Sequence, residues 1–302
     1  MANPNQPEPD SREGADDPTA RMSFFDHLAE LRTRLLWVVA SIGIGFCVGL
    51  LFSREAYAFL AQPMMDALRG AGLGDKLIST SPLGPLRLYI STGLYLGIVI
   101  ASPMVLYQVW LFVAPGLYRN ERRAVVSFIF SGVFLFLAGT AFAYLVLLPF
   151  TLKFLASMFV EGGFAAYISI NEYFDLVLVI LLGLGLIFQL PILIFILSVF
   201  GIVTPRFLWD NFQYAVLVIA MLAAIITPTT DVVTMMVFMV PMLGLYVVGI
   251  AVSAAVVRSK KKAAGEPVAS LRPLGILAIL LAVGAALAWA GYHYGWWSGL
   301  KW

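Results

Sequence analysis

Long apolar stretches alternate with short polar segments along most of this chain. Seven predominantly apolar runs occupy residues 35–52, 87–112, 124–148, 173–200, 208–226, 232–257 and 271–292. A helix of about 20 apolar residues crosses a bilayer, and each run is near that length. The pattern predicts an all-α polytopic membrane protein with seven spans, the last of them near the C-terminus.

The polar segments divide the chain into four parts. We expect a disordered cytoplasmic tail at 1–21, a membrane domain at 22–258, a basic cytoplasmic linker at 259–270, and an additional transmembrane helix with an aromatic outer end at 271–302. The tail is rich in Pro, Asp and Glu, which disfavours folding. The linker contains three consecutive lysines.

Shorter features are predicted within the membrane domain. Apolar residues recur at helical spacing over 23–34, which favours an amphipathic helix lying on the membrane before the first span. A second surface helix is expected over 56–68. Because proline disrupts helices, Pro103 should interrupt the second span and Pro149 should end the third.

Composition supports the membrane class. The chain is 61% hydrophobic and 12% charged, with a mean hydropathy of +0.92, whereas soluble proteins are about a quarter charged. A net charge of only +2 does not indicate a nucleic-acid-binding protein. The single cysteine, Cys47, lies within the first apolar run and is expected to pack as a small buried hydrophobe.

The distribution of Lys and Arg predicts the orientation. With a cytoplasmic N-terminus, 13 of the 19 basic residues fall on the cytoplasmic side. Positive charge collects on that side of membrane proteins. Seven spans then place the C-terminus outside.

Catalytic chemistry has little support in the sequence. The two histidines, His27 and His293, lie near predicted interfaces, and no metal-ligand cluster falls within a span. Asp175 and Asp231 lie near outer ends of spans, where solvation at the interface is favoured over an intramembrane protease pair. We expect neither an enzyme nor a cofactor.

Gln189 is the most prominent polar residue within a span. An unpaired amide in hydrocarbon costs several kcal/mol, so Gln189 must face protein, water or a partner. Pro191 follows it and frees a backbone carbonyl one turn earlier. Two interpretations remain equally open: an internal hydrogen bond between helices, or a polar patch for a partner helix or substrate.

Two acidic residues stand beside arginines at predicted cytoplasmic ends of spans. Glu30 precedes Arg32 and Arg34, and Glu121 precedes Arg122 and Arg123. One interpretation is local pairing on a solvated surface. The other is that both carboxylates receive a cationic ligand, because a guanidinium binds a carboxylate in bidentate geometry.

Several motifs, in order and with suitable spacing, resemble the TatC family, the multi-spanning receptors of the twin-arginine protein translocase. They are His27-Leu-Ala-Glu-Leu-Arg32, Tyr107-Gln-Val-Trp-Leu-Phe-Val-Ala-Pro-Gly-Leu-Tyr118 with Glu121-Arg-Arg123, Phe142-Ala-Tyr144 with Pro149, Phe188-Gln-Leu-Pro191, and Thr227-Pro228 with Asp231. The resemblance covers residues 22–258.

The resemblance implies binding of twin-arginine signal peptides on folded precursor proteins, in a bacterial inner membrane. It further implies assembly with the single-span TatA and TatB subunits, export driven by the proton gradient, and a possible homo-oligomer in the receptor complex. The implied peptide-binding residues are Glu30, Glu121, Arg32, Phe112, Pro115 and Tyr118; the implied intramembrane polar positions are Gln189, Pro191 and Asp231.

Two features qualify this resemblance. Family members often carry glutamate at the position of Gln189, and they usually have six spans, so nothing carries over to residues 259–302. The alternative function is a small-solute secondary transporter, which would require charged or unwound sites at the middle of the membrane.

Overall fold

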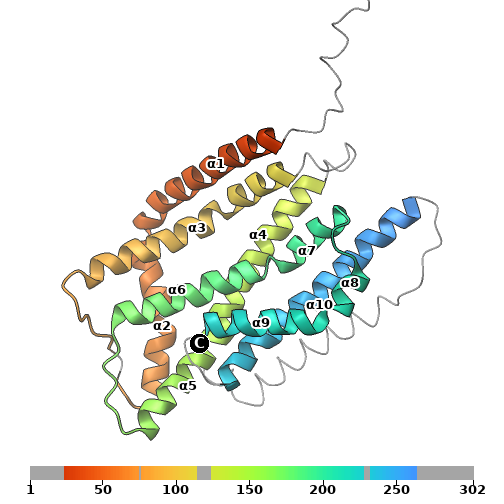
Figure 1. The fold of residues 1–302 in the computed structure, drawn as a ribbon. Coiled ribbons are helices and arrows are strands. Elements are labelled where there is room, and N and C mark those ends of the chain that lie inside the picture. Colours follow the sequence, from red (N-terminus) through yellow and green to blue (C-terminus); the bar gives the residue numbers. More distant parts are fainter. Residues whose placement is uncertain (1–23, 75, 114–123, 228–231, 264–302) are drawn as a thin grey trace, which may run out of the picture.

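The structure is a computed structural model that describes residues 24–74, 76–113, 124–227 and 232–263. Its regular elements in these ranges are helices. They are α1 (Phe24–Leu51), α2 (Ser53–Gly70), α3 (Gly84–Val113), α4 (Ala124–Phe142), the π-helical turn η3 (Ala143–Leu147), α5 (Leu148–Glu161), α6 (Ile170–Ile187), α7 (Leu190–Val199), α8 (Pro205–Asp210), α9 (Phe212–Ile226) and α10 (Val232–Ala263) (Figure 1).

Five helical stretches are long and apolar enough to cross a membrane. They are Leu28–Leu51, Gly84–Phe112, Ile129–Glu161, Ile170–Val199 and Thr234–Ser259. These confirm five of the predicted spans, and the other run within the described part of the chain forms the shorter apolar helix α9. The predicted seventh span lies outside the described residues.

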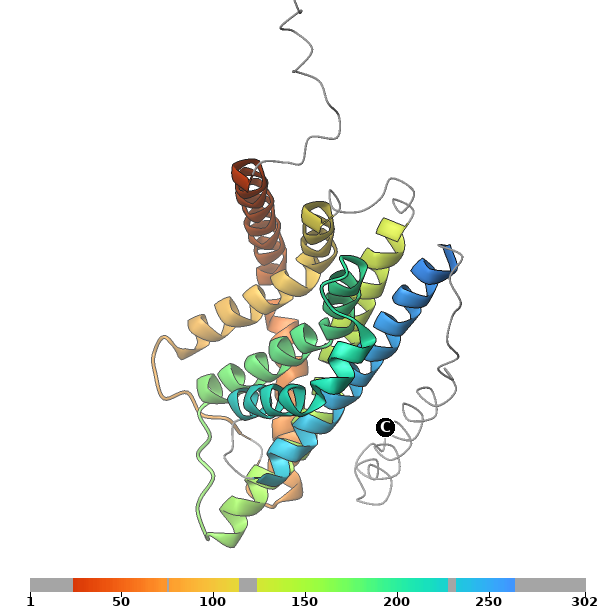
Figure 2. The same ribbon diagram turned by 45° about the vertical axis from the view of Figure 1, so that its right-hand side comes forward.

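The helix ends gather at two opposite ends of the bundle. Figures 1 and 2 show that α1 begins, α3 ends and α4 begins at the same end. We call this the α1/α3 end; the predicted orientation assigns it to the cytoplasm. Helices α2 and α5 lie toward the opposite end, which we call the outer end.

Glycines bring α1 and α3 into backbone contact along an antiparallel seam. A Cβ added at Gly45 would clash with the Gly97 carbonyl oxygen, and one added at Gly49 would clash with the Gly93 carbonyl oxygen. A Cβ at Gly97 would in turn lie 2.6 Å from the Phe46 nitrogen. Small residues permit such contact between membrane helices, so these positions set the register of α1 against α3.

Two expected helix interruptions are wrong, for different local reasons. Helix α3 continues through Pro103, and the Ser102 hydroxyl donates a 2.7 Å hydrogen bond to the Val99 carbonyl that the proline leaves without its amide donor. Helix α5 begins before Pro149, which sits in its first turn after the wide turn η3. A π-helical turn relaxes the clash of the proline ring with the preceding turn.

Two further expectations at the first span are corrected. Residues 24–51 form one continuous helix, so no separate surface helix precedes the span. Cys47 is exposed on α1 instead of buried, because the buried side of this helix is occupied by glycines.

The surface helix predicted over 56–68 is confirmed as α2, and two tyrosines hold it at the outer end. Pro63 lacks the amide that would bond to the Phe59 carbonyl. The Tyr144 hydroxyl donates to that carbonyl at 2.9 Å, and the Tyr173 hydroxyl donates to the Leu60 carbonyl at 2.7 Å. Leu60 and Tyr173 belong to the larger buried apolar cluster of the described residues, and Tyr144 packs against it.

The glycine seam makes a direct stability prediction. Gly45→Ala should destabilise the protein by about 1–3 kcal/mol, because its methyl group meets the α3 backbone. Gly43→Ala is the matched control on the same helix, since an added Cβ there meets nothing within 4 Å. Melting of the detergent-solubilised variants, followed by tryptophan fluorescence, should separate them. Equal melting temperatures for both variants would contradict the proposed seam.

Candidate functional site

The predicted site residues fall at two places in the described bundle. Glu30, Arg32 and Phe112 lie at the α1/α3 end, whereas Gln189 and Pro191 lie at the junction of α6 and α7. The remaining predicted site residues lie outside the described residues: Pro115, Tyr118, Glu121 and Asp231.

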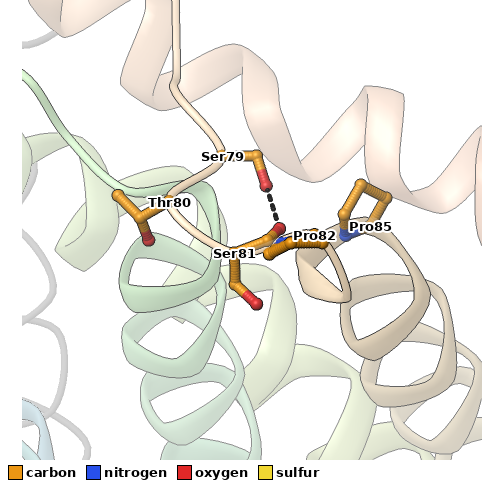
Figure 3. Close-up of a pocket in the computed structure, with 5 residues that line it drawn as sticks. All are labelled: Ser79, Thr80, Ser81, Pro82 and Pro85. Atoms are coloured by element: carbon orange, nitrogen blue, oxygen red, sulfur yellow. Dashed lines mark hydrogen bonds between the residues drawn. The ribbon is translucent and has the colours of Figure 1, made fainter.

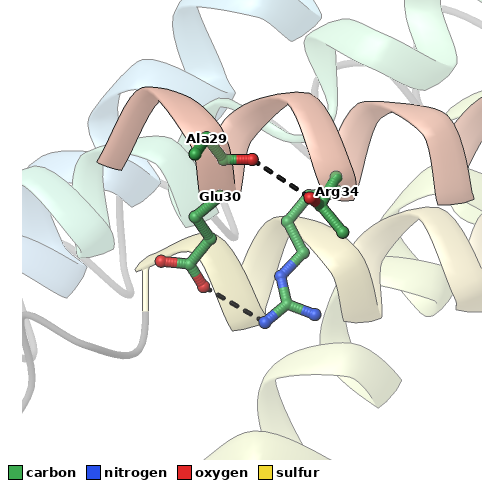
Figure 4. A network of polar contacts seen from close by, with 4 residues as sticks. Ala29, Glu30 and Arg34 are labelled. Carbon is green, nitrogen blue, oxygen red and sulfur yellow. Dashed lines mark hydrogen bonds and ion pairs between the residues drawn. The ribbon is translucent and has the colours of Figure 1, made fainter. Parts of the chain in front are cut away.

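Glu30 and Arg34 form an ion pair on one face of α1. They are one helical turn apart, so their side chains lie on the same side of the helix. The Arg34 Nη2 donates to the Glu30 Oε1 at 3.1 Å (Figure 4). The Glu30 side chain is only 16% exposed, and that of Arg34 is 28% exposed. Glu30 thus has the local arginine partner that one interpretation expected, on a largely covered face of the helix and not a solvated one.

The ion pair leaves part of each charged group unused. The Glu30 Oε2 and the Arg34 Nε are buried, and neither has a hydrogen-bond partner within the part of the chain that the structure describes. An ionised carboxylate has about four acceptor positions on its two oxygens. Glu30 therefore retains capacity for a further donor.

The end of α3 contributes aromatic and polar side chains beside this pair. Phe112 is half-buried and Trp110 is 2% exposed, whereas Arg32 on α1 is exposed to solvent. Gln108 is 4% exposed, and its Oε1 has no partner in the described ranges. Sequence reasoning missed Gln108, although a glutamine inside an apolar run was a visible signal.

The glycine seam relates these residues across the two helices. Gly45 faces Gly97 and Gly49 faces Gly93. Because the helices are antiparallel, the same register carried three turns toward the α1/α3 end places Arg34 at the level of Gln108. One further turn places Glu30 at the level of Phe112.

Gln189 occupies the break between α6 and α7. Its Nε2 donates to the Gly132 carbonyl of α4 at 2.9 Å, and its Oε1 is buried without a partner among the described residues. The side-chain nitrogen must face Gly132, because a carbonyl can only accept. Pro191, in the first turn of α7, is buried. The expected internal hydrogen bond is thus present at the amide nitrogen of Gln189, and the amide oxygen remains available for another donor.

The outer end carries polar groups of different chemistry. Arg87 and Asp175 form a 2.7 Å ion pair between the first turns of α3 and α6, and both side chains are about half-exposed. A cleft of about 440 Å³ lies nearby, in the turn before α3 (Figure 3). Its lining is Ser79, Thr80, Ser81, Pro82 and Pro85. These hydroxyls and proline rings supply no charge, and no metal-ligating cluster occurs in the described ranges.

The sequence and the fold were compared with known proteins. The family model described as "Sec-independent protein translocase protein (TatC)" matches residues 26–241. The protein of that name from Koribacter versatilis is 46% identical over 232 residues, covering 77% of this chain and 85% of that protein. Its namesake from Aquifex aeolicus is 33% identical over 242 residues, covering 80% and 98%.

A solved structure resembles the bundle in three dimensions. The crystal structure of a twin-arginine translocase receptor, TatC, superposes with a TM-score of 0.68 at 33% identity. The match covers 77% of this chain and all of that chain. The family match includes both places described above, the α1/α3 end and the junction at Gln189.

Proposed function

Because this chain belongs to the TatC family of Sec-independent protein translocase proteins, we propose that it is the receptor that binds twin-arginine signal peptides at the cytoplasmic membrane surface. The chain is a multi-pass membrane protein of a protein-transport family, which favours this role over small-solute transport. The observation that carries the proposal is the half-buried Glu30 carboxylate with an unpaired oxygen at the α1/α3 end.

The chemistry of Glu30 suits a guanidinium ligand. Its carboxylate already accepts a hydrogen bond from an arginine of its own chain. It lies in a partly desolvated position, where a charge-assisted bond is stronger than on an open surface. A lysine would offer a point charge without the fork of parallel donors, so such a site would prefer arginine.

We assign the second acidic position to Glu121. Residues 114–123 connect the end of α3 with the beginning of α4, both at the α1/α3 end. The connection therefore starts and finishes close to the end of the bundle that carries Glu30. Two carboxylates at this end would match two adjacent guanidinium groups. In this proposal Arg32, Phe112, Pro115 and Tyr118 shape the surrounding surface.

We assign the assembly role to the junction of α6 and α7. The unpaired Oε1 of Gln189 is an acceptor between two membrane helices, and a donor from a single-span TatA or TatB subunit would satisfy it. Pro191 keeps the helix broken at this point. Asp231, in the segment between α9 and α10, is the third polar position in the proposal. Further copies of this chain would join the receptor complex, and the proton gradient would drive export.

The proposed topology places the N-terminus in the cytoplasm of a bacterial cell. Six spans form the receptor body across the inner membrane, with α9 as the short fifth span. Residues 271–302 form an additional span, so the C-terminus lies outside. The basic residues of 258–262 hold the preceding linker on the cytoplasmic side.

Charge removal tests the binding site. Glu30→Gln and Glu121→Gln should each weaken binding of a synthetic paired-arginine signal peptide by about 1.5–3 kcal/mol, or roughly 10- to 100-fold. The peptide affinity of the purified protein in detergent is the measurement. Asp210→Asn is the control, because it removes an acid from an exposed pair on α8. Unchanged affinity in the double variant would refute the assignment.

Assembly should depend on Gln189 more than stability does. Gln189→Leu removes the bond to Gly132 and the unpaired oxygen together, so melting should shift little. Copurification of TatA and TatB should fall severalfold. Gln62→Leu, at an exposed position of α2, is the matched control. If the Gln189 variant copurified normally, the side chain would serve internal packing alone.

A reporter tests the seventh span. Alkaline phosphatase, which is active only outside the cytoplasm, should be active when fused after Trp302 and inactive when fused after Lys262. Between Leu274 and Ala290 the sequence has no charge, so a helix there has no polar face with which to lie flat on the membrane. Activity after both positions, or after neither, would contradict the crossing.

A further inference from the structure

The strongest unexplained feature of the α1/α3 end is that Glu30 is already occupied. Arg34 Nη2 is bound to Glu30 Oε1 at 3.1 Å, and both side chains are largely covered. A bidentate guanidinium–carboxylate pair uses both carboxylate oxygens. Arg34 occupies one acceptor position of Oε1, so an incoming guanidinium either shares that oxygen with Arg34 or displaces it. Bidentate binding of a ligand is therefore in competition with the internal pair.

A second position for Arg34 exists at the same level of the seam. Gln108 is 4% exposed, and its Oε1 has no hydrogen-bond partner within the described part of the chain. The register set by Gly45 and Gly97, carried three turns along the helices, puts Gln108 at the level of Arg34. The Arg34 Nε is likewise buried and unpaired. A guanidinium donor and an amide acceptor, both unsatisfied, thus lie at neighbouring positions of two packed helices.

We propose that Arg34 is an internal competitor of the signal peptide: it neutralises Glu30 while the site is empty, and turns to the Gln108 carboxamide oxygen when a peptide guanidinium takes the carboxylate. The proposal rests on the function proposed above and adds a residue that sets affinity. It also explains why a polar Gln108 is retained in the apolar run of α3.

The exchange has a physical advantage over an empty carboxylate. An unpaired, half-buried charge is costly, and Arg34 removes that cost in the resting state. A pair one turn apart on a helix is weak in water and only moderately stronger when partly buried. A ligand that brings two guanidiniums can therefore displace Arg34, whereas a single cation gains little over the internal partner. Arg34 would thus favour paired arginines over isolated positive charges.

Substitution of Arg34 gives the first test. Arg34→Gln should tighten binding of the paired-arginine peptide by about three- to tenfold, since the internal competitor is gone. Arg34→Lys keeps a competing charge and should stay within about twofold of the parent. Arg206→Gln is the matched control, because Arg206 forms the same one-turn pair with Asp210 but is 92% exposed. It should leave affinity unchanged.

A double-mutant cycle with Gln108 separates competition from a general charge effect. Gln108→Leu should weaken peptide binding severalfold when Arg34 is present, because the displaced guanidinium loses its acceptor. In the Arg34→Gln background the same change should have no effect. Melting curves of each variant verify that the fold is retained. If Arg34→Gln does not fold, Arg34→Lys replaces it in the test. The double variant Arg34→Lys/Gln108→Leu should then bind the peptide more weakly than Arg34→Lys.

The outcomes distinguish this proposal from the one it rests on. If Glu30→Gln leaves peptide affinity unchanged, the binding site itself is misassigned. If Glu30→Gln weakens binding but Arg34→Gln also weakens it, Arg34 orients Glu30 for the ligand and the competitor is refuted. Equal effects of Arg34→Gln and Arg206→Gln, or an effect of Gln108→Leu that is independent of Arg34, would also overturn it.

Discussion

A polar group inside a bilayer has no water to bind, and this constraint governs the internal contacts of the bundle. The carbonyl that Pro103 leaves without a donor receives the Ser102 hydroxyl, and the one that Pro63 leaves receives the Tyr144 hydroxyl. Gln189 donates to a backbone carbonyl of α4 across the helix break. At Pro103 and Pro63 the freed carbonyl is thus matched by a nearby hydroxyl donor, and the helix continues through the proline.

The same constraint makes the partly satisfied groups conspicuous. Several buried side-chain polar atoms have no hydrogen-bond partner in the described part of the chain, and among them are the carboxylate or amide oxygens of Glu30, Gln108 and Gln189. Two of them lie at the end where α1 and α3 meet, and the third lies at a broken helix. Buried polar groups without partners are rare in proteins because they are destabilising. In the proposals above, Glu30 and Gln189 receive donors from other molecules, whereas Gln108 receives the displaced Arg34 of the same chain.

Much of the fold could be predicted from residue pattern, whereas the site could be predicted only in part. Apolar run length located the five long spans, whereas the end of α6 and start of α7 at Gln189 divide a run, 173–200, that was expected as one span. Local rules failed at Pro103 and Pro149, because a neighbouring hydroxyl and a π-helical turn compensated for the proline. The pairing of Glu30 with Arg34 was visible in the spacing. The role of Gln108 was not, since it depends on the register between two helices that no local pattern encodes.

The shortness of α9 has a consequence for the surrounding lipid. Fifteen residues of α-helix rise about 22 Å, against a hydrocarbon thickness of about 30 Å. One flank of α9 exposes large apolar side chains to the bilayer: Tyr214, Leu217, Val218, Met221 and Ile225. Lipid beside this flank must shorten or tilt to cover it, while lipid beside the longer α10 need not. With α9 as the proposed fifth span, the bilayer would be under uneven elastic strain around the protein and thinnest along α9.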